Sequence, residues 1–427
     1  MLAILFTVFF TMMVINLPIA FCIGYGVLAA LVLTTSIPAT IIPLKMYSMI
    51  NSFPLLAIPL YVMAGALMNS SGITGRLINL ARALVGFVKG GIAMTAVLAS
   101  MFFGGVSGSS LADTAAIGSV LIPEMRKEGY DKHFAVGLIA SAGTLGGIIP
   151  PSISMVLYGV VSGTSIADLF IAGALPGVLL GIAFMIVSYF YARKHDYPVG
   201  PMPSLQGVVK ALLDGLIPLG MPVIIVGGIY GGVFTATEAG MIAILYALFV
   251  GLVVYRSLSL RDVVKAIIDS AETSAIPALI IAFSGGFAFL SSYGGIPTAL
   301  SNFISSITDS RVVVLLLINV MLLIIGMFMD GAAVYPIVVP IFLPLLVRMG
   351  VTPLHFGVII VLNLSIGLIT PPVGGTLYTA CAISGLQPLP VARKAMYFIV
   401  VAIVVLMLTT YVPWIAEFLP GLLGGKR

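Results

Sequence analysis

The 427-residue sequence has little charge. Only 8% of its residues are Asp, Glu, Lys or Arg, where soluble domains carry about a quarter. Hydrophobic residues make up 60% of the chain, and the mean hydropathy is +1.23. The apolar runs are long and show no strand-like alternation, which predicts helices rather than a β-barrel. We therefore expect an all-α polytopic membrane protein that lipid surrounds over most of its length.

Reactive residues are also scarce, and this excludes several classes of function. The two cysteines, Cys22 and Cys381, lie far apart in apolar runs and offer neither a disulfide framework nor zinc spacing. No Walker loop and no H-E-x-x-H motif occurs, so neither ATP hydrolysis nor metalloenzyme chemistry is expected. The net charge of +5 comes from cations in short loops and does not indicate nucleic-acid binding. The sequence does not favour an enzyme.

Apolar segments of about 20 residues predict the membrane crossings. They lie near 2–20, 22–42, 52–69, 134–164, 168–192, 215–235, 238–255, 273–293, 353–384 and 394–418.

Two further apolar stretches, 90–123 and 312–347, are interrupted at their centres by Gly, Ser and Asp. Each is predicted to be a re-entrant hairpin, because irregular backbone at membrane depth is tolerated only where protein or a watery cavity satisfies it. Segment 73–88 carries basic residues among leucines and isoleucines at helical spacing, which predicts a helix along the membrane interface. Segment 263–272 shows a weaker form of the same pattern.

The distribution of basic residues predicts the orientation. With the N-terminus outside, and with each hairpin returning to its own side, fourteen of the 19 Lys and Arg residues fall inside. The five predicted outside are Lys45, Arg311, Arg348, Lys426 and Arg427.

An internal repeat links the two halves of the chain. Segments 123–134 and 344–356 both carry proline, glycine and His-Phe in this order, and the pattern G-x-I-x-P-P occurs at 146–151 and 367–372. The same offset, about 221 residues, aligns both candidate hairpin turns: Gly105 with Gly326, and Ser109 with Asp330. Because the two hairpins open on opposite sides, this predicts an inverted repeat with its site at the midplane. The predicted parts are scaffold segments 1–89 and 193–310, and transport segments 90–192 and 311–427.

The first hairpin turn is rich in glycine and serine and ends at Asp113. Glycines permit a broken helix, whose free carbonyls and neighbouring hydroxyls suit a sodium ion, while half-helix N-termini suit a carboxylate. A helix-packing seam is the alternative, since small residues also line such seams. Asp113 and Asp330 are costly inside apolar segments, which favours a functional role. For Asp113 a purely structural hydrogen bond to the backbone of the turn is the alternative.

The paired prolines at 150–151 and 371–372 interrupt two predicted helices. Proline lacks an N–H and leaves a carbonyl of the preceding turn unpaired. Carbonyl groups near each break are therefore candidate ligands for the adjacent hairpin turn. A plain helix kink is the alternative at each position. The candidates are Gly146, Ile149 and Pro151 in the first repeat, and Gly367, Thr370 and Pro372 in the second.

At these motifs the sequence resembles the large membrane subunit of tripartite ATP-independent periplasmic (TRAP) transporters. Phe102–Asp113, Gly143–Pro151, Met329–Gly331 and Leu368–Gly374 carry the resemblance, which extends over nearly the whole chain. It implies the elevator-type fold of the ion-transporter superfamily, in which a domain with both hairpins slides against a fixed scaffold.

The resemblance also implies at least two sodium sites, one at each hairpin turn, with the substrate between them. The implied ion ligands are Ser107, Ser109, Gly146, Ile149 and Pro151 at the first turn, and Gly326, Asp330, Gly367, Thr370 and Pro372 at the second. The implied substrate-binding residues are Ser107, Ser110, Asp113, Asp330 and Thr370.

The same resemblance implies partners and a cargo. A small four-helix membrane subunit is expected as a separate polypeptide, together with a periplasmic binding protein that delivers a small carboxylate at the bacterial inner membrane. The cargo expected first is sialic acid, taken up with sodium. The alternatives are a C4-dicarboxylate or another organic acid, or a stand-alone sodium–dicarboxylate symporter that needs no binding protein.

Overall fold

The computed structural model describes residues 1–15, 17–308 and 310–424, and these residues form helices joined by short turns. Lys426 and Arg427, which the charge count placed outside, lie beyond the described residues. The first half of the chain contains α1 (Leu2–Val14), α2 (Ile19–Thr34), α3 (Ile41–Ile50), η1 (Phe53–Leu56), α4 (Ala57–Ser70), α5 (Ile73–Val85), α6 (Gly91–Ser107), α7 (Ser110–Lys127), α8 (Lys132–Gly143), η2 (Thr144–Gly147), α9 (Ile153–Ser162) and α10 (Ile166–Lys194).

The second half continues with helices of similar length. They are α11 (Leu205–Tyr230), α12 (Ala236–Phe249), η3 (Val250–Val254), α13 (Leu260–Tyr293), α14 (Ile296–Ile307), α15 (Arg311–Phe328), α16 (Gly331–Arg348), α17 (Pro353–Gly367), α18 (Gly375–Ser384), α19 (Pro388–Tyr411) and α20 (Trp414–Gly424).

Side-chain caps fix where several of these helices begin. Thr235 and Glu238 form a reciprocal capping box at the start of α12, and Ser259 and Asp262 do the same at the start of α13. Such boxes satisfy backbone N–H groups that have no partner within the helix. Ser152 caps α9 directly after the first proline pair, so the broken segment resumes as a helix within two residues.

Among the described residues, eight helices are long and apolar enough to cross a membrane by length and composition. They are Phe53–Ser70, Ile166–Lys194, Leu205–Tyr230, Ala236–Val254, Leu260–Tyr293, Arg311–Phe328, Gly331–Arg348 and Pro388–Tyr411. The chain is thus an all-helical polytopic membrane protein, as its composition predicts.

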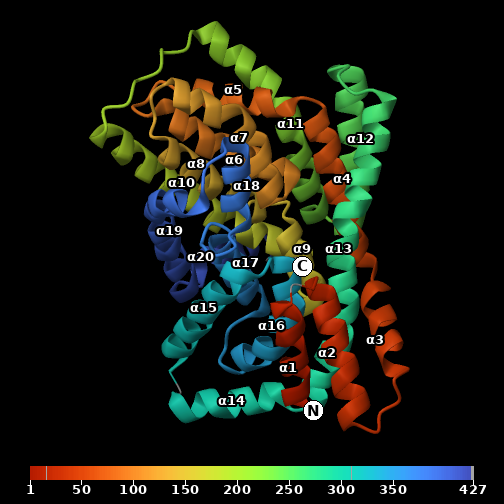
Figure 1. Cartoon of the computed structure of the whole chain (residues 1–427). Coiled ribbons are helices and arrows are strands. Elements are labelled where there is room, and N and C mark those ends of the chain that lie inside the picture. The colour runs from red at the N-terminus through yellow and green to blue at the C-terminus, as the bar shows by residue number, and fades with distance from the viewer. Residues whose placement is uncertain (16, 309, 425–427) are drawn as a thin grey trace.

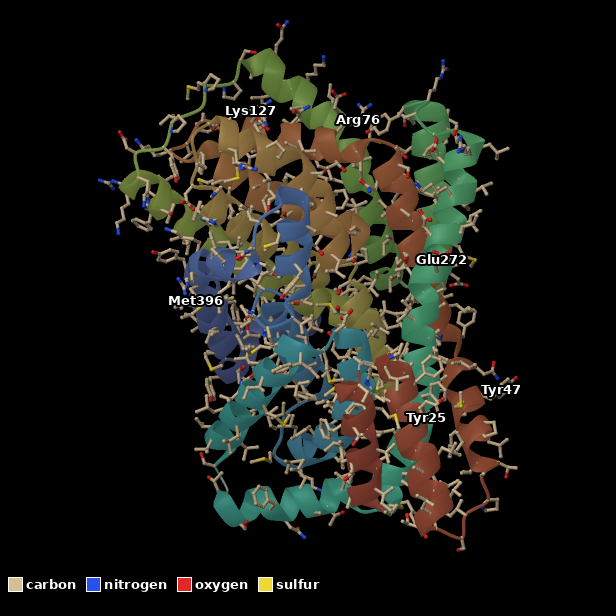
Figure 2. The ribbon with its side chains drawn as sticks, in the orientation of Figure 1. Tyr25, Tyr47, Arg76, Lys127, Glu272 and Met396 are labelled. Carbon is tan, nitrogen blue, oxygen red and sulfur yellow. The ribbon has the colours of Figure 1, made fainter. Side chains whose placement is uncertain are left out.

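The element spacing repeats along the chain with the offset seen in the sequence motifs. The helices α5 to α10 recur in order as α14 to α19, and α7 and α16 are both 18 residues long. Figure 1 shows α5 and α14 lying across opposite ends of the molecule, with the N-terminus at the α14 end. Arg76 and Lys127 lie at the α5 end (Figure 2).

Some predicted boundaries were wrong. The expected interface helix at 263–272 is the first part of α13, a continuous helix of 34 residues that packs against α2, α3, α4 and α16. Pro277 lies inside this helix but does not end it, because tertiary packing overrides the low helix propensity of proline. The counterpart of α5 in the second repeat is instead α14, which is also amphipathic. The sequence did not reveal it because α14 contains no basic residue.

The predicted crossings at the N-terminus were also too long. The first helix ends at Val14, and the chain restarts as α2 after Pro18. That helix ends at Thr34, and the segment read as the end of a second crossing leads into α3. Proline at positions 18 and 38 divides these apolar runs, because it cannot continue a helix from the preceding turn.

Candidate functional site

Two helix hairpins meet two interrupted helices near the centre of the chain's packed interior. The α6–α7 hairpin turns at Gly108, which has a positive φ of 63°, beside the break between η2 and α9. The N–H of Ile153 donates to the Gly108 carbonyl at 3.1 Å, joining the first turn to the break. The α15–α16 turn likewise joins the second break, because the Val373 N–H donates to the Met327 carbonyl at 3.1 Å. The Pro150–Pro151 and Pro371–Pro372 peptide bonds are both cis.

The first turn is closed around Asp113. The Ser107 hydroxyl donates to Asp113 Oδ1 at 2.8 Å, and the Ser109 N–H donates to Ser107 Oγ at 3.2 Å. Asp113 is fully buried in the first turn of α7, and its Oδ2 atom has no hydrogen-bond partner among the described residues. Asp113 therefore bonds to a side chain of the turn rather than to its backbone, which the structural alternative required, and it retains one carboxylate oxygen without a described partner.

Glycines bring the backbone of the first break against this carboxylate. A Cβ on Gly146 would collide with Asp113 Oδ2, and it would lie 3.1 Å from the carbonyl oxygen of Ser109. A Cβ on Gly104 would lie 2.8 Å from the Gly146 Cα, so both positions need glycine for this approach. The carbonyl oxygen of Pro151 faces Gly108, where a Cβ would lie only 2.6 Å away.

The structure thus gathers four of the five predicted first-site residues: Ser107, Ser109, Gly146 and Pro151. Ile149 lies between two of them in the chain. Its side chain packs against Gly177 of α10, and its N–H bonds to Leu145.

The second turn is more open. Asp330 precedes α16 but makes no side-chain capping bond, and its side chain is exposed. Gly326 and Gly367 touch through their backbones, because a Cβ on Gly367 would collide with the Gly326 carbonyl group. The Thr370 hydroxyl donates to the Ile366 carbonyl at 2.8 Å, which leaves its oxygen lone pairs free to accept. Pro372 is exposed beside Thr370.

Both turns reach one cavity of about 690 Å³. Ser109 and Ser110 line it from the first turn and Asp330 from the second, while α2, α4 and α13 form the opposite wall. Of the described residues that line it, only Asp330 carries a formal charge. A smaller adjoining cavity of about 230 Å³ shares Ser109 and also includes Ser107. Asp330 is therefore exposed to an internal space rather than to the outer surface.

Three of the five predicted substrate-binding residues line a cavity, and the other two do not. Ser110 and Asp330 line the larger cavity and Ser107 lines the smaller one. Asp113 lies behind the first turn, and Thr370 is not among the described residues that line either cavity.

Sequence reasoning missed Thr273 of α13, which lines both cavities. Its signal was the polar group Glu272-Thr273-Ser274, where the predicted interface helix 263–272 met the predicted crossing 273–293. Ser154 of α9 lines the larger cavity and was missed as well.

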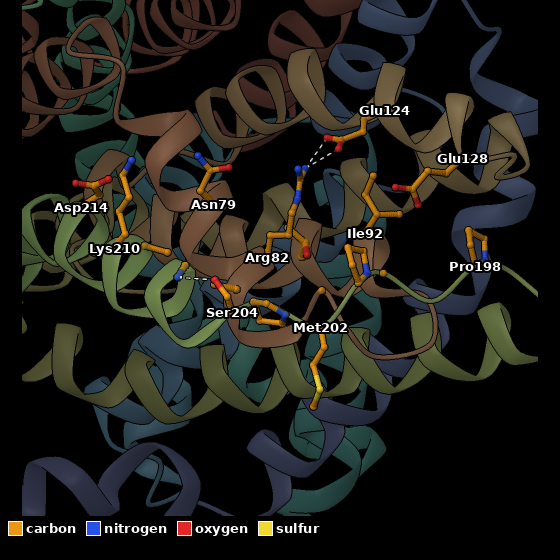
Figure 3. Close-up of a pocket in the computed structure, with 18 residues that line it drawn as sticks. Asn79, Arg82, Ile92, Glu124, Glu128, Pro198, Met202, Ser204, Lys210 and Asp214 are labelled. Carbon is orange, nitrogen blue, oxygen red and sulfur yellow. Dashed lines mark hydrogen bonds and ion pairs between the residues drawn. The ribbon is translucent and has the colours of Figure 1, made fainter.

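A separate cavity of about 580 Å³, with several charged residues in its lining, lies at the α5 end of the molecule (Figure 3). Arg82 of α5 reaches across it to α7 and donates to both carboxylate oxygens of Glu124 at 2.7 Å. Burial and the neighbouring Glu124 carboxylate raise the pKa of Glu128 at the same edge. This cavity contains none of the hairpin-turn residues, and its ion pair joins α5 to the C-terminal end of α7.

A polytopic helical protein in which two interrupted helices and two hairpin turns converge on one internal cavity has the architecture of a membrane permease. A sequence model of the family described as "Tripartite ATP-independent periplasmic transporter, DctM component" matches residues 6–415. The chain belongs to this family. It is a multi-pass permease subunit of a bacterial membrane and not an enzyme.

Relatives with similar identity carry different substrate names. The chain is 39% identical to the sialic acid TRAP transporter large permease protein SiaM of Vibrio cholerae, with 96% of each chain covered. It is 40% identical to the C4-dicarboxylate large permease protein DctM of Pseudomonas aeruginosa, with 89% of each covered. It is 38% identical to the isethionate permease protein DctMQ of Oleidesulfovibrio alaskensis, covering 98% of this chain but only 66% of that protein.

The fold is similar to a solved transporter. The crystal structure of the Alcanivorax borkumensis YdaH transporter superposes with a TM-score of 0.60 at 15% identity, covering 87% of both chains. At this identity the likeness concerns the fold alone. The family membership rests on the sequence matches.

Proposed function

We propose that this chain is the large membrane subunit of a sodium-coupled TRAP transporter that takes up an organic acid across the inner membrane. The observation that carries the proposal is the convergence of both hairpin turns on one cavity. These turns belong to different halves of the chain, and they bring hydroxyl, carbonyl and carboxylate oxygens to the same space. In secondary transporters built from inverted repeats, ions and substrate bind at such a junction.

The oxygen atoms gathered at the first turn are of the kind that bind a sodium ion. Asp113 Oδ2 is a buried oxygen without a described partner, and the Ser109 carbonyl oxygen lies beside the same Gly146 backbone. A buried unpaired carboxylate is costly and requires compensation. Sodium held by Asp113, Ser107, Ser109 and the Gly146 backbone would provide it. The resemblance did not assign Asp113 to this ion site, so its inclusion comes from the geometry.

The second turn would hold a further sodium ion between Asp330 and the second break. Gly326 and Gly367 bring the two backbones into contact there, and the Thr370 oxygen retains acceptor capacity. Because Asp330 faces the cavity, an ion at this turn would lie next to the substrate. The remaining predicted ligand, Pro372, follows Thr370 by two residues.

The cavity also constrains how an organic acid would bind. Its described lining includes no basic side chain, so the substrate carboxylate would need positive charge from elsewhere. Sodium ions at the two turns and the N-terminal ends of α7 and α16 would supply it. Transport of the acid would then depend on sodium. The volume of about 690 Å³ falls in the range of small-molecule sites and does not separate sialic acid from a C4-dicarboxylate.

The movement that we propose is of the elevator type. The segments with α6–α10 and α15–α19 would slide as one body against a scaffold built from α1–α4 and α11–α13. The helices α5 and α14, which lie at opposite ends of the molecule, would connect the two parts (Figure 1). A small four-helix membrane subunit and a periplasmic binding protein, the partners that the family implies, would complete the transporter.

Uptake into proteoliposomes tests the proposal directly. Vesicles that contain the chain and its small subunit receive labelled sialic acid, with or without an inward sodium gradient and with or without the binding protein. Uptake that needs both additions supports the proposal. Uptake with sodium alone would instead indicate a stand-alone symporter, and C4-dicarboxylate is the next substrate to test if sialic acid is not taken up.

A further inference from the structure

A chain of buried polar side chains joins three helices of the second repeat. The Asn363 amide donates to Asn319 Oδ1 at 2.6 Å and to the Ile359 carbonyl at 3.1 Å. The Asn319 amide in turn donates to Thr410 Oγ1 at 3.1 Å. The three residues belong to α17, α15 and α19, and each is at most 1% exposed. We call this set the amide ladder.

The first repeat has nothing equivalent. The residues 221 positions before Asn319 and Asn363 are Leu98 and Ala142, whose side chains form no hydrogen bonds. Apolar packing therefore suffices at this place in one half of the molecule. Buried amides inside a membrane protein need partners, so their presence in the other half calls for a specific reason.

The position of the ladder supplies that reason. Asn319 lies seven residues before Gly326 on α15, and Asn363 lies four residues before Gly367 on α17. The helices α15 and α17 thus contact each other at two places. Their amides meet first along both chains, and their glycine backbones meet closer to the turn. The contact between glycines lets the two backbones approach closely, whereas the hydrogen bond of 2.6 Å between the amides also requires a particular donor to face a particular acceptor.

We propose that the amide ladder fixes the register of α15 against α17 and so sets the position of Asp330 relative to Thr370. Asn319, Asn363 and Thr410 are then positioning residues for the second sodium site, although none of them would touch the ion. This inference rests on the proposed function. It goes further by assigning a residue set outside the cavity to ion affinity at one of the two turns.

The test replaces the ladder with the side chains of the first repeat, as the double variant Asn319→Leu/Asn363→Ala. Thr410→Val is a milder variant that removes only the hydroxyl. Each protein is purified with its small subunit, and its melting temperature is measured against sodium concentration at constant ionic strength with choline as the replacement. Because ligand stabilisation follows RT ln(1 + c/Kd), where c is the sodium concentration, the curve yields an apparent sodium dissociation constant, which we expect to rise about fivefold, the change that corresponds to about 1 kcal/mol for one lost hydrogen bond.

Two matched controls separate positioning from general stability. Thr410→Ser keeps the hydroxyl and should restore the wild-type sodium curve. Thr409→Val removes a neighbouring buried hydroxyl that bonds only within α19, to Val405, so it should lower the melting temperature without moving the sodium curve. If Thr410→Val leaves the sodium curve unchanged, or if Thr409→Val shifts it equally, the positioning role is refuted.

The design also separates this inference from the proposed function. If the wild-type melting temperature does not respond to sodium at all, the proposed sodium coupling itself fails. If the wild type responds and Thr410→Val responds identically, only the amide ladder loses its role. Should the double variant fail to fold, Thr410→Val and its two controls still decide the question.

Discussion

The two hairpin turns are equivalent in the repeat, but each carries its carboxylate at a different position, since Asp330 aligns with Ser109 and not with Asp113. In the first turn Asp113 is fully buried and bound to Ser107, and the Gly146 backbone lies against it. In the second turn Asp330 makes no capping bond and faces the cavity. The first turn is therefore stabilised locally, whereas the second keeps its carboxylate available to a ligand. Two turns of one repeat thus place a carboxylate differently, one buried behind the turn and one facing the cavity.

The largest effect is expected at the open turn. Asp330→Ala removes a carboxylate that interacts with the neighbouring Gly331 and Ala332 backbone at the start of α16 and with no side chain of another helix, so folding should be retained. Sodium-driven uptake should fall at least about tenfold, because charged contacts contribute about 1.5–3 kcal/mol. Uptake in proteoliposomes and elution in size-exclusion chromatography check both parts. Full uptake by this variant would remove Asp330 from the ion site.

The closed turn should respond differently to the same change. Asp113→Ala leaves the buried Ser107 hydroxyl without its acceptor, at a cost of about 1–3 kcal/mol. We expect a lower melting temperature as well as lost uptake, and Asp113→Asn should recover part of the stability because it can still accept from Ser107. A variant that loses uptake at an unchanged melting temperature would show that Asp113 resembles Asp330 after all.

A smaller effect is expected at Ser107. Ser107→Ala removes one hydroxyl oxygen from the first turn and should raise the sodium concentration for half-maximal uptake about fivefold, which corresponds to about 1 kcal/mol. The maximal rate should change less, because the substrate cavity remains lined by Ser109 and Ser110. An unchanged sodium curve would favour the helix-packing seam over an ion site.

The smallest effect is expected at the ion pair of the α5 end. The Arg82 and Glu124 side chains are 44% and 32% exposed, so Arg82→Ala should cost less than about 1 kcal/mol of stability. The difference should shrink as salt is added, since exposed pairs are screened. Thermal unfolding at low and high salt measures it. A large loss that is independent of salt would mean that Arg82 acts through packing rather than charge.

Much of this site could be predicted from the sequence because the constraint is local. Glycine, a polar residue and paired proline interrupt apolar runs twice at the same spacing, and the structure places each turn beside the break of its own repeat. The arrangement of Ser107, Ser109, Gly146 and Pro151 follows from this pattern. The role of Asp113 could not be decided, because it depends on a hydrogen bond to Ser107 and on complete burial.

Features that arise from packing between distant helices were missed. Thr273 lines the cavity only because α13 passes the hairpin turns, and its sequence neighbourhood is equally typical of an interface helix. The helix α14 was missed since it carries only neutral polar residues on its hydrophilic face. The link between Asn319 and Asn363 joins residues 44 positions apart on separate helices, and no short motif indicates it.

The most direct test of the central claim is substrate protection of one cysteine on each turn. Leu111 and Ala332 both line the larger cavity, so Leu111→Cys and Ala332→Cys are made separately after Cys22 and Cys381 are replaced by alanine. Labelling by a membrane-permeant maleimide is measured with and without sodium and the transported acid. We predict that the acid protects both cysteines, and only when sodium is present. Protection of one turn alone, or protection without sodium, would contradict a shared sodium-coupled site.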